Sequence, residues 1–153
     1  MLRIVLLAPE IPGNTGSIGR SCLALNAQLI LIKPYGFDLS EKAVRRAGLD
    51  YWKHVNITEY NNWEDFLKNE SPNRSQLFFH ENDGKKSVQK ADYKKDSYLI
   101  FGSETKGISQ ELYSEFFDRF YYLPQFSEHI RSINLANAVT AVSYQAYFQS
   151  HSD

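Results

Sequence analysis

Cysteine is nearly absent from this chain of 153 residues, and its one copy, Cys22, has no partner for an internal disulfide. This cysteine content fits a reducing cytoplasm and excludes a disulfide framework. No apolar run approaches the roughly 18 residues that a membrane-spanning helix needs. The first residues enter a strand pattern without a charged region or a small-residue cleavage site, so no signal peptide is expected. We therefore expect a cytoplasmic protein with no membrane partner.

The chain also lacks an excess of positive charge. It has 17 lysines and arginines against 18 acidic residues, which gives a net charge of −1. Such a protein has no global basic field to attract nucleic acid. A local basic patch, or a cleft built by a dimer, would not show in the net charge, so an RNA-binding role stays open.

Several common functional signatures are missing. The four histidines are scattered without the spacing of metal ligands, so we predict no metal site. The chain has no P-loop, no dinucleotide-binding glycine pattern and no kinase signature. It also lacks the Gly-x-Ser-x-Gly pattern of serine hydrolases. Function must therefore come from less familiar segments.

What the chain does contain is a regular alternation of short apolar runs and helical stretches. Its 42% hydrophobic and 14% aromatic content excludes a disordered chain. Strands separated by helices predict an α/β fold with a parallel sheet and helices on both faces, in one domain over residues 1–153. Strands are expected at 4–8, 29–32, 55–57, 77–80, 98–101 and 120–123. Helices are expected at 15–26, 40–47, 63–68, 109–116 and 135–149, and a polar surface excursion at 81–97.

The unusual segments all follow predicted strands. They are residues 9–16, His80, 102–107 and 124–134. In an open parallel sheet, ligands bind beyond the carboxyl ends of the strands. Convergence of these loops on one sheet edge therefore predicts a pocket.

The first loop contains Gly-Asn-Thr-Gly at 13–16, just ahead of a predicted helix. Asn14 or Thr15 could cap that helix, whose N-terminus would offer free amides and a positive dipole end to a phosphate. Arg20 follows about one turn later and could lie near the same mouth. The alternative is a plain capped helix with a surface arginine.

The later loops leave similar alternatives. In Gly-Ser-Glu-Thr-Lys-Gly at 102–107, Glu104 could accept a hydrogen bond from a ligand amine or from another loop, but the segment could also be an ordinary turn. The stretch 131–139 crowds an arginine, a serine and two asparagines at a helix entrance. Capping explains Ser132 or Asn134 but not all of these residues.

Four stretches together resemble one known family. They are Pro-Glu-Ile-Pro-Gly-Asn-Thr-Gly at 9–16 with Arg20, Arg-Arg-Ala-Gly-Leu-Asp-Tyr at 45–51, Phe-Gly-Ser-Glu-Thr-Lys-Gly at 101–107, and Leu123-Pro124 with Arg-Ser-Ile-Asn-Leu-Ala-Asn-Ala at 131–138. In this order the chain resembles the SPOUT-class RNA 2′-O-methyltransferases. It is most similar to their small tRNA (cytidine/uridine) wobble-position subfamily, and the resemblance covers nearly the whole chain.

The resemblance implies a fold, a cofactor and partners. The expected fold is a parallel α/β domain whose C-terminal part is threaded into a trefoil knot. The expected cofactor is S-adenosylmethionine, with S-adenosylhomocysteine as product. The expected partners are tRNA and a second copy of the chain, because the family forms homodimers whose active site is completed across the interface.

The resemblance also implies roles for particular residues. Arg20, supported by Asn14 and Asn134, is expected at the reacting 2′-hydroxyl. Tyr144 matches a dimer-interface tyrosine. The residues expected to bind the cofactor, many of them through the backbone, are His80, Gly102, Glu104, Leu123 and Ser132.

The basic residues Lys42, Arg45 and Arg46 lie close together in sequence and are candidates for contacting RNA. A solvated helix face is the alternative explanation for them. Two other functions also remain open, namely a related methyltransferase that acts on ribosomal RNA and a non-catalytic RNA-binding module with the same fold. The expected reaction is methyl transfer to a ribose of the tRNA anticodon. Mapping of any methylated nucleotide would separate it from these alternatives.

Overall fold

The computed structural model describes residues 1–40 and 49–152, and a seven-stranded sheet runs through them. The strands stand in the order β3-β2-β1-β6-β4-β7-β5, and every pairing between neighbours is parallel. The prediction of a parallel sheet is confirmed. The strands are β1 (Arg3–Leu7), β2 (Gln28–Ile32), β3 (Ile57–Tyr60), β4 (Leu77–His80), β5 (Lys86–Ser87), β6 (Tyr98–Phe101) and β7 (Phe120–Tyr122).

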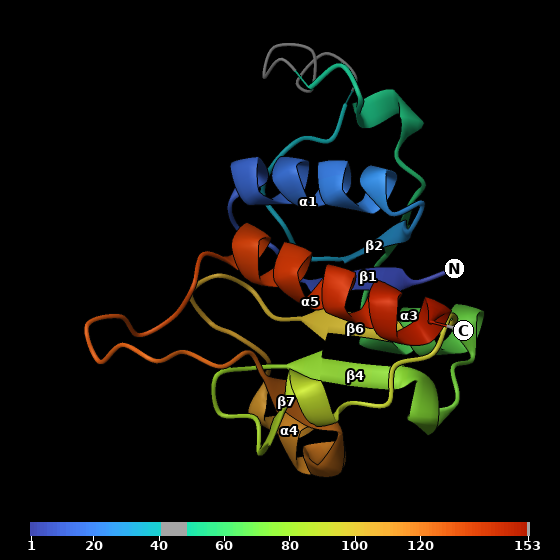
Figure 1. Ribbon diagram of the computed structural model, residues 1–153. Helices are drawn as coiled ribbons and strands as arrows, with labels where there is room; N and C mark the ends of the chain where they lie inside the picture. Colours follow the sequence, from blue (N-terminus) through green and yellow to red (C-terminus); the bar gives the residue numbers. More distant parts are fainter. Residues whose placement is uncertain (41–48, 153) are drawn as a thin grey trace.

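Helices cover both faces of this sheet. Figure 1 shows α1 and α5 side by side in front of the strands, with α3 behind them. The α-helices are α1 (Pro12–Ala24), α3 (Trp63–Glu70), α4 (Gln110–Glu115) and α5 (Leu135–His151). Short 3-10 turns are η1 (Trp52–His54), η2 (Arg74–Gln76), η3 (Val88–Lys90) and η4 (Phe117–Arg119).

The two faces follow from the alternation of side chains along each strand. Ile4 and Leu6 of β1 belong to the core cluster that contains α1 and α5 residues, whereas Val5 belongs to the cluster under α3 and α4. Successive side chains of a strand point to opposite faces. A strand buried on both faces must therefore be apolar throughout, which is why the central strands read as continuous hydrophobic runs.

Three local predictions were wrong. Helix α1 begins at Pro12, and its N-cap Ile11 makes no side-chain cap, so neither Asn14 nor Thr15 caps it. Proline at the first helical position needs no amide partner, which explains the earlier start. The third strand lies at 57–60 instead of 55–57. The segment 81–97 is no surface excursion, because Tyr93 within it is only 2% exposed.

Other expectations are not decided by the fold. The predicted helix at 40–47 lies almost wholly outside the described residues. The trefoil knot stays a prediction of the resemblance, since strand order and pairing do not test how the chain end is threaded. Within residues 1–40 and 49–152, no helix is long and apolar enough to cross a membrane.

Candidate active site

A cavity of about 540 Å³ lies at the carboxyl ends of β4, β6 and β7. Its walls come from the four segments that the sequence singled out, so the predicted convergence is confirmed. Seven of the predicted site residues line it: Asn14, His80, Gly102, Glu104, Leu123, Ser132 and Asn134. The remaining wall is mostly apolar or acidic and includes Ile11, Glu81, Asp83, Leu135, Ala138 and Val142.

Glu104 joins the loop after β6 to the loop after β1. One carboxylate oxygen accepts the backbone amide of Glu10 at 2.9 Å, and the other accepts that of Ile11 at 2.7 Å. The second oxygen also accepts the side-chain amide of Asn14 at 3.2 Å. Of the two partners considered for Glu104, another loop is therefore the one that the structure contains. Hydrogen bonds to a charged group are stronger than neutral ones, so this contact holds the two loops together.

Asn14 extends this network to the third loop. Its side-chain oxygen accepts the amide of Asn134 at 3.1 Å. The side-chain oxygen of Asn134 in turn accepts the backbone amide of Asn137 at 3.2 Å and caps α5. The capping predicted for Asn134 is confirmed. One line of hydrogen bonds, Glu104 to Asn14 to Asn134, thus crosses the cavity wall.

Glu10 makes a reciprocal contact that sequence reasoning missed. Its carboxylate accepts the Thr105 hydroxyl at 2.7 Å and the Thr105 backbone amide at 3.2 Å. The side-chain hydrogen bonds from Thr105 and Ser103 lower the pKa of Glu10. Each of the two loops therefore sends one carboxylate to the other. The signal was present in the sequence as a glutamate in each motif, but nothing there paired them.

His80 is buried and neutral. Its Nδ1 lies 3.1 Å from the Ile100 carbonyl oxygen, and its Nε2 lies 2.9 Å from the Tyr93 hydroxyl. A carbonyl can only accept, so Nδ1 carries the proton and Nε2 accepts from Tyr93. Burial lowers the pKa of His80 to about 4. Its side chain therefore ties β4 to β6 and to the segment before β6.

This histidine should make stability depend on pH. Unfolded His80 takes up a proton near pH 6.5, whereas the folded side chain stays neutral down to about pH 4. Between these values the unfolded state binds more protons, so the free energy of unfolding falls as pH is lowered. The full difference amounts to about 3 kcal/mol. We expect urea unfolding at pH 7 and pH 4.5 to show a smaller pH dependence for His80→Gln than for the wild type.

His129→Gln is the matched control, because that histidine is exposed on the loop before α5. Burial raises the pKa of Glu81, so this carboxyl makes the free energy of unfolding rise as pH is lowered through the acidic range. Glu81 is present in both variants, so its contribution cancels in the comparison. An equal pH dependence in wild type and His80→Gln would contradict the buried neutral histidine.

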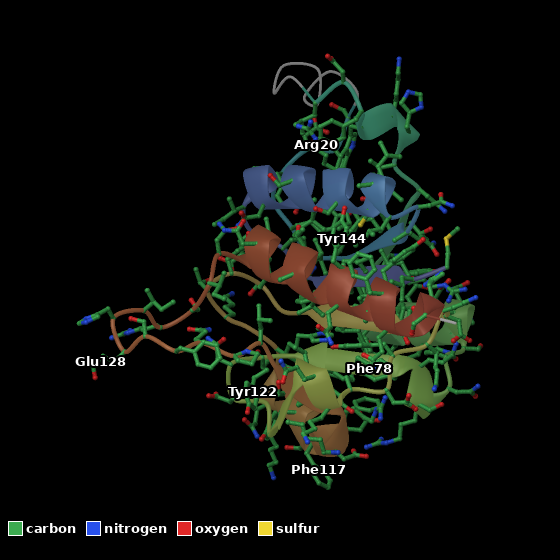
Figure 2. The ribbon with its side chains drawn as sticks, viewed as in Figure 1. Arg20, Phe78, Phe117, Tyr122, Glu128 and Tyr144 are labelled. Carbon is green, nitrogen blue, oxygen red and sulfur yellow. The ribbon has the colours of Figure 1, made fainter. Side chains whose placement is uncertain are left out.

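The segment after β4 supports the cavity through two residues that the sequence did not suggest. Glu81 accepts the backbone amide of Ile108, beyond the loop that contains Glu104. Asn82 donates to the Arg131 carbonyl at 3.2 Å and accepts from the Gln125 side chain at 3.2 Å. Asn82 therefore closes the base of the loop before α5. Figure 2 shows Glu128 at the outer end of this loop, well away from the sheet.

Two further predicted residues, Arg20 and Tyr144, do not line this cavity, and a third set lies outside the described residues. Arg20 is exposed on α1 and does not line the cavity of its own chain; Figure 2 shows it on the side of α1 away from α5. Tyr144 is 38% exposed on α5. The proposed RNA-binding residues Lys42, Arg45 and Arg46 lie outside the described residues. Their roles stay predictions.

Arg20 has an aromatic neighbour, Tyr51. Its Cζ lies 5.4 Å from the centroid of the Tyr51 ring, and no ion pair joins it to a carboxylate in the described part of the chain. The Tyr51 hydroxyl donates to the Gly16 carbonyl at 2.9 Å. Burial raises the pKa of Tyr51, which keeps the hydroxyl protonated as a donor.

Among the described residues no group of three or more His, Cys, Asp or Glu side chains could hold a metal ion.

Comparison with known proteins agrees with this geometry. Residues 1–144 match the model of the SpoU rRNA Methylase family. A tRNA (cytidine(34)-2′-O)-methyltransferase of Saccharophagus degradans is 39% identical, over 97% of this chain and 96% of that protein. A relative from Bacillus subtilis is also 39% identical, over 98% of this chain and 94% of its own length.

Solved structures give the same result. One that concerns the 2-OH methylation of C/U34 on tRNA has a TM-score of 0.87 and 39% identity, covering 97% of this chain and 95% of that one. The SpoU methyltransferase AviRb of Streptomyces viridochromogenes, solved with the cofactor AdoMet, has a TM-score of 0.81 and 26% identity. It covers 97% of this chain and 60% of AviRb.

Proposed function

The chain belongs to the SpoU rRNA Methylase family, and we propose that it methylates the ribose 2′-oxygen of the wobble nucleotide, a cytidine or modified uridine, in a tRNA anticodon loop. It is an S-adenosylmethionine-dependent tRNA 2′-O-methyltransferase. Two relatives of nearly equal length support this substrate. One is named a tRNA (cytidine(34)-2′-O)-methyltransferase, and the other is a solved structure that concerns methylation of C/U34 on tRNA. The observation that carries the proposal is the cavity whose three loops are joined through Glu104, Asn14 and Asn134.

The cofactor is S-adenosylmethionine, and the cavity suits it. Leu123, Leu135 and Val142 offer apolar surface to a ring, while Glu81 and Asp83 offer carboxylates to a cationic ligand. When bound, the cofactor supplies a methyl group activated by a sulfonium sulfur, and S-adenosylhomocysteine remains as product. We assign its binding to residues that line the cavity: His80, Gly102, Glu104, Leu123 and Ser132.

The polar wall positions the ribose. We propose that Asn14 and Asn134, which are hydrogen-bonded to each other, orient the 2′-hydroxyl toward the methyl group. Both side chains are held by other contacts, Asn14 by Glu104 and Asn134 by the entrance of α5. Orientation of this kind can lower a reaction barrier by several kcal/mol because it removes the search for the reactive geometry.

Arg20 acts on the charge that develops at the ribose. An arginine keeps its proton at working pH and is a poor general base, but its fork of N–H groups binds a phosphate or an alkoxide well. Because Arg20 does not line the cavity of its own chain, we propose that it completes the cavity of a second protomer. Arg20 there clamps the adjacent phosphate and stabilises the developing alkoxide, while water takes the proton.

Arg20→Lys tests the clamp. A lysine keeps the positive charge and could even serve as a base, but it lacks the planar fork. We expect kcat for methyl transfer to tRNA to fall at least about tenfold, with the Kd for S-adenosylmethionine unchanged, because loss of one charge-assisted hydrogen bond costs about 1.5–3 kcal/mol. Steady-state kinetics and calorimetry measure the two quantities. Near-wild-type kcat would exclude the clamp in favour of a base.

The outer face of α5 is the proposed dimer interface. Phe148 is 65% exposed and Tyr144 38%, and their rings lie 6.0 Å apart. Leu23 of the neighbouring α1 is 38% exposed. Exposed large apolar side chains gathered on adjacent elements are typical of an interface. We therefore propose a homodimer built on α1 and α5.

Replacing Phe148 with arginine should break this dimer. We expect light scattering to give twice the 17.7 kDa chain mass for the wild type and the single chain mass for Phe148→Arg at micromolar concentration. A buried unpaired arginine at an apolar contact costs several kcal/mol. Phe117→Arg is the control, because Phe117 is 51% exposed but lies in η4, remote in sequence from both helices. A dimer that survives Phe148→Arg would exclude this face.

A transfer assay tests the function itself. The protein is incubated with labelled S-adenosylmethionine and, separately, with total tRNA and with ribosomal RNA, and any methylated nucleotide is mapped. We expect 2′-O-methylation at the wobble position of tRNA. Transfer only to ribosomal RNA would replace the proposed substrate, and transfer to neither would leave a non-catalytic RNA-binding module.

We place the enzyme in the cytoplasm, where its tRNA substrate would be met. Cys22 supports this proposal, because it is a free cysteine buried between α1 and the sheet. Burial raises the pKa of its thiol to about 12, which makes it a poor nucleophile for disulfide exchange.

A further inference from the structure

Residues 49–52, which lead into η1, pack on α1 at two glycines. A Cβ at Gly16 would lie 2.8 Å from a methyl group of Leu49, and one at Gly19 would lie 2.4 Å from the Trp52 ring. Both distances are too short for real contacts, so a side chain at Gly19 would overlap the Trp52 ring and one at Gly16 would force Leu49 to move. Glycine weakens a helix interior relative to alanine. Two glycines one turn apart therefore point to a packing requirement at this place.

Tyr51 lies between these two contacts and is held at both ends. Its hydroxyl donates to the carbonyl of Gly16 at 2.9 Å, and its ring lies 5.4 Å from the Arg20 guanidinium carbon. In an α-helix the carbonyl of residue 16 is also the acceptor for the amide of residue 20. The hydroxyl is thus anchored to the same helical turn that bears Arg20.

An aromatic ring and a carboxylate would have different effects on this arginine. A carboxylate would occupy the N–H groups of the guanidinium and offset its charge. A ring attracts the cation to its face, yet leaves the N–H groups in the guanidinium plane free to bind another group. In the described part of the chain no carboxylate forms an ion pair with Arg20. Among residues 1–40 and 49–152, then, no carboxylate offsets its charge or occupies its hydrogen-bond donors.

We propose that Tyr51 is a positioning residue, which holds the Arg20 guanidinium in the orientation that the phosphate and the developing alkoxide require. This inference rests on the function proposed above for Arg20. Leu49 and Trp52 hold Tyr51 in place, because they pack against Gly16 and Gly19 on either side of it. This packing explains why the helix has two glycines at this turn, for which the cavity itself gives no reason.

Three variants test the inference by kinetics. Tyr51→Phe keeps the ring and loses the hydroxyl, Tyr51→Leu loses both, and Tyr113→Leu removes a similarly half-buried tyrosine from α4 as a control. We expect kcat on tRNA to stay within about threefold for Tyr51→Phe and to fall at least about tenfold for Tyr51→Leu, since small errors of orientation have large effects on rate. The Kd for S-adenosylmethionine should be unchanged in all three, because Tyr51 does not line the cavity.

A second measurement does not depend on activity. The Nε–Hε resonance of Arg20, identified by its loss in Arg20→Lys, reports the ring beside it. We expect this resonance to keep its shift in Tyr51→Phe and Tyr113→Leu and to move in Tyr51→Leu. Thermal unfolding shows whether Tyr51→Leu is folded; if it is not, Tyr51→Met, which also removes the ring, takes its place in both measurements.

The outcomes separate the two proposals. Wild-type kcat in a folded Tyr51→Leu, or an Arg20 resonance that does not move in that variant, would overturn the positioning role. An equal loss of kcat in Tyr51→Phe and Tyr51→Leu would also overturn it, since the ring would then have no role. If the wild type itself transfers no methyl group to RNA, the proposed function fails, and the resonance alone tests the contact between Tyr51 and Arg20.

Discussion

Replacing Gly102 with alanine is expected to weaken the binding of S-adenosylmethionine up to about a hundredfold. A Cβ at this position would lie 2.2 Å from the Gly107 carbonyl carbon and 2.6 Å from the Ile108 nitrogen. Both are backbone atoms, so no side-chain rotation can relieve the overlap, and the loop itself must move. Overpacking of this kind typically costs about 1–3 kcal/mol, and a cost of about 3 kcal/mol at the binding site weakens affinity about a hundredfold.

The tightness of this loop explains why it cannot adapt. Gly107 donates its amide to the Ser103 carbonyl at 3.0 Å and has a φ of +65°, a conformation that glycine adopts easily. The turn therefore closes directly onto the end of β6. Moving it would also displace Glu104 and the hydrogen bonds that Glu104 accepts from the first loop.

Gly36→Ala is the matched control, because a Cβ there would meet no atom within 4 Å. Calorimetric titration with S-adenosylhomocysteine measures affinity, and urea unfolding measures stability. We expect Gly36→Ala to match the wild type in both. Wild-type affinity in a folded Gly102→Ala would mean that the loop after β6 does not bind the cofactor.

The fold followed from simple patterns in the sequence. Continuous apolar runs such as 29–32, separated by helical stretches, predict a parallel sheet because only strands buried on both faces need such runs. The segment 81–97 shows where this reasoning stops. Its buried hydrophobic residues, Val88, Ala91 and Tyr93, are irregularly spaced and lie around a 3-10 turn and a two-residue strand. No periodicity of helix or strand marks such a segment as core.

The candidate site was predicted as a set of loops but not as a network. The carboxyl ends of parallel strands meet at one edge, which was enough to bring Asn14, Glu104 and Asn134 together. The individual hydrogen bonds span 90 to 120 residues of sequence, and no local rule pairs such distant side chains. The contact between Glu10 and Thr105, 95 residues apart, was hidden for the same reason. His80 and Tyr93 are only 13 residues apart, but they lie in different segments and no local rule pairs them either.

Arg20 shows how helix geometry decides what a motif can reach. It follows Asn14 by six residues, which is about 240° around an α-helix. Asn14 faces the cavity, so Arg20 points to a different side of α1 and lies over Tyr51 instead. The proposed site, which uses both residues, therefore takes Arg20 from a second protomer. If Arg20 has the proposed role, this geometry favours a dimer without reference to the exposed rings on α5.

Replacing Glu104 with glutamine is expected to destabilise the protein and to weaken cofactor binding together. The two side chains have the same shape, but glutamine has one acceptor oxygen and one donor nitrogen. That nitrogen would face a backbone N–H of Glu10 or Ile11, which would lose its partner. Hydrogen bonds to charged groups contribute about 1.5–3 kcal/mol, so we expect the free energy of unfolding to fall by about 2–3 kcal/mol in urea titrations.

Glu10→Gln is the matched control, since it removes the reciprocal carboxylate between the same two loops. Glu10 is exposed, so water can replace the hydrogen bonds from Thr105, and its effect should be clearly smaller. The kinetic difference should be larger still, because only Glu104 also contacts Asn14 and through it Asn134. We expect kcat to fall in Glu104→Gln even when S-adenosylmethionine is saturating. Equal losses of stability and of kcat in both variants would contradict this. The two carboxylates would then contribute equally, and the hydrogen bonds from Glu104 through Asn14 to Asn134 would have no special role in orienting the ribose.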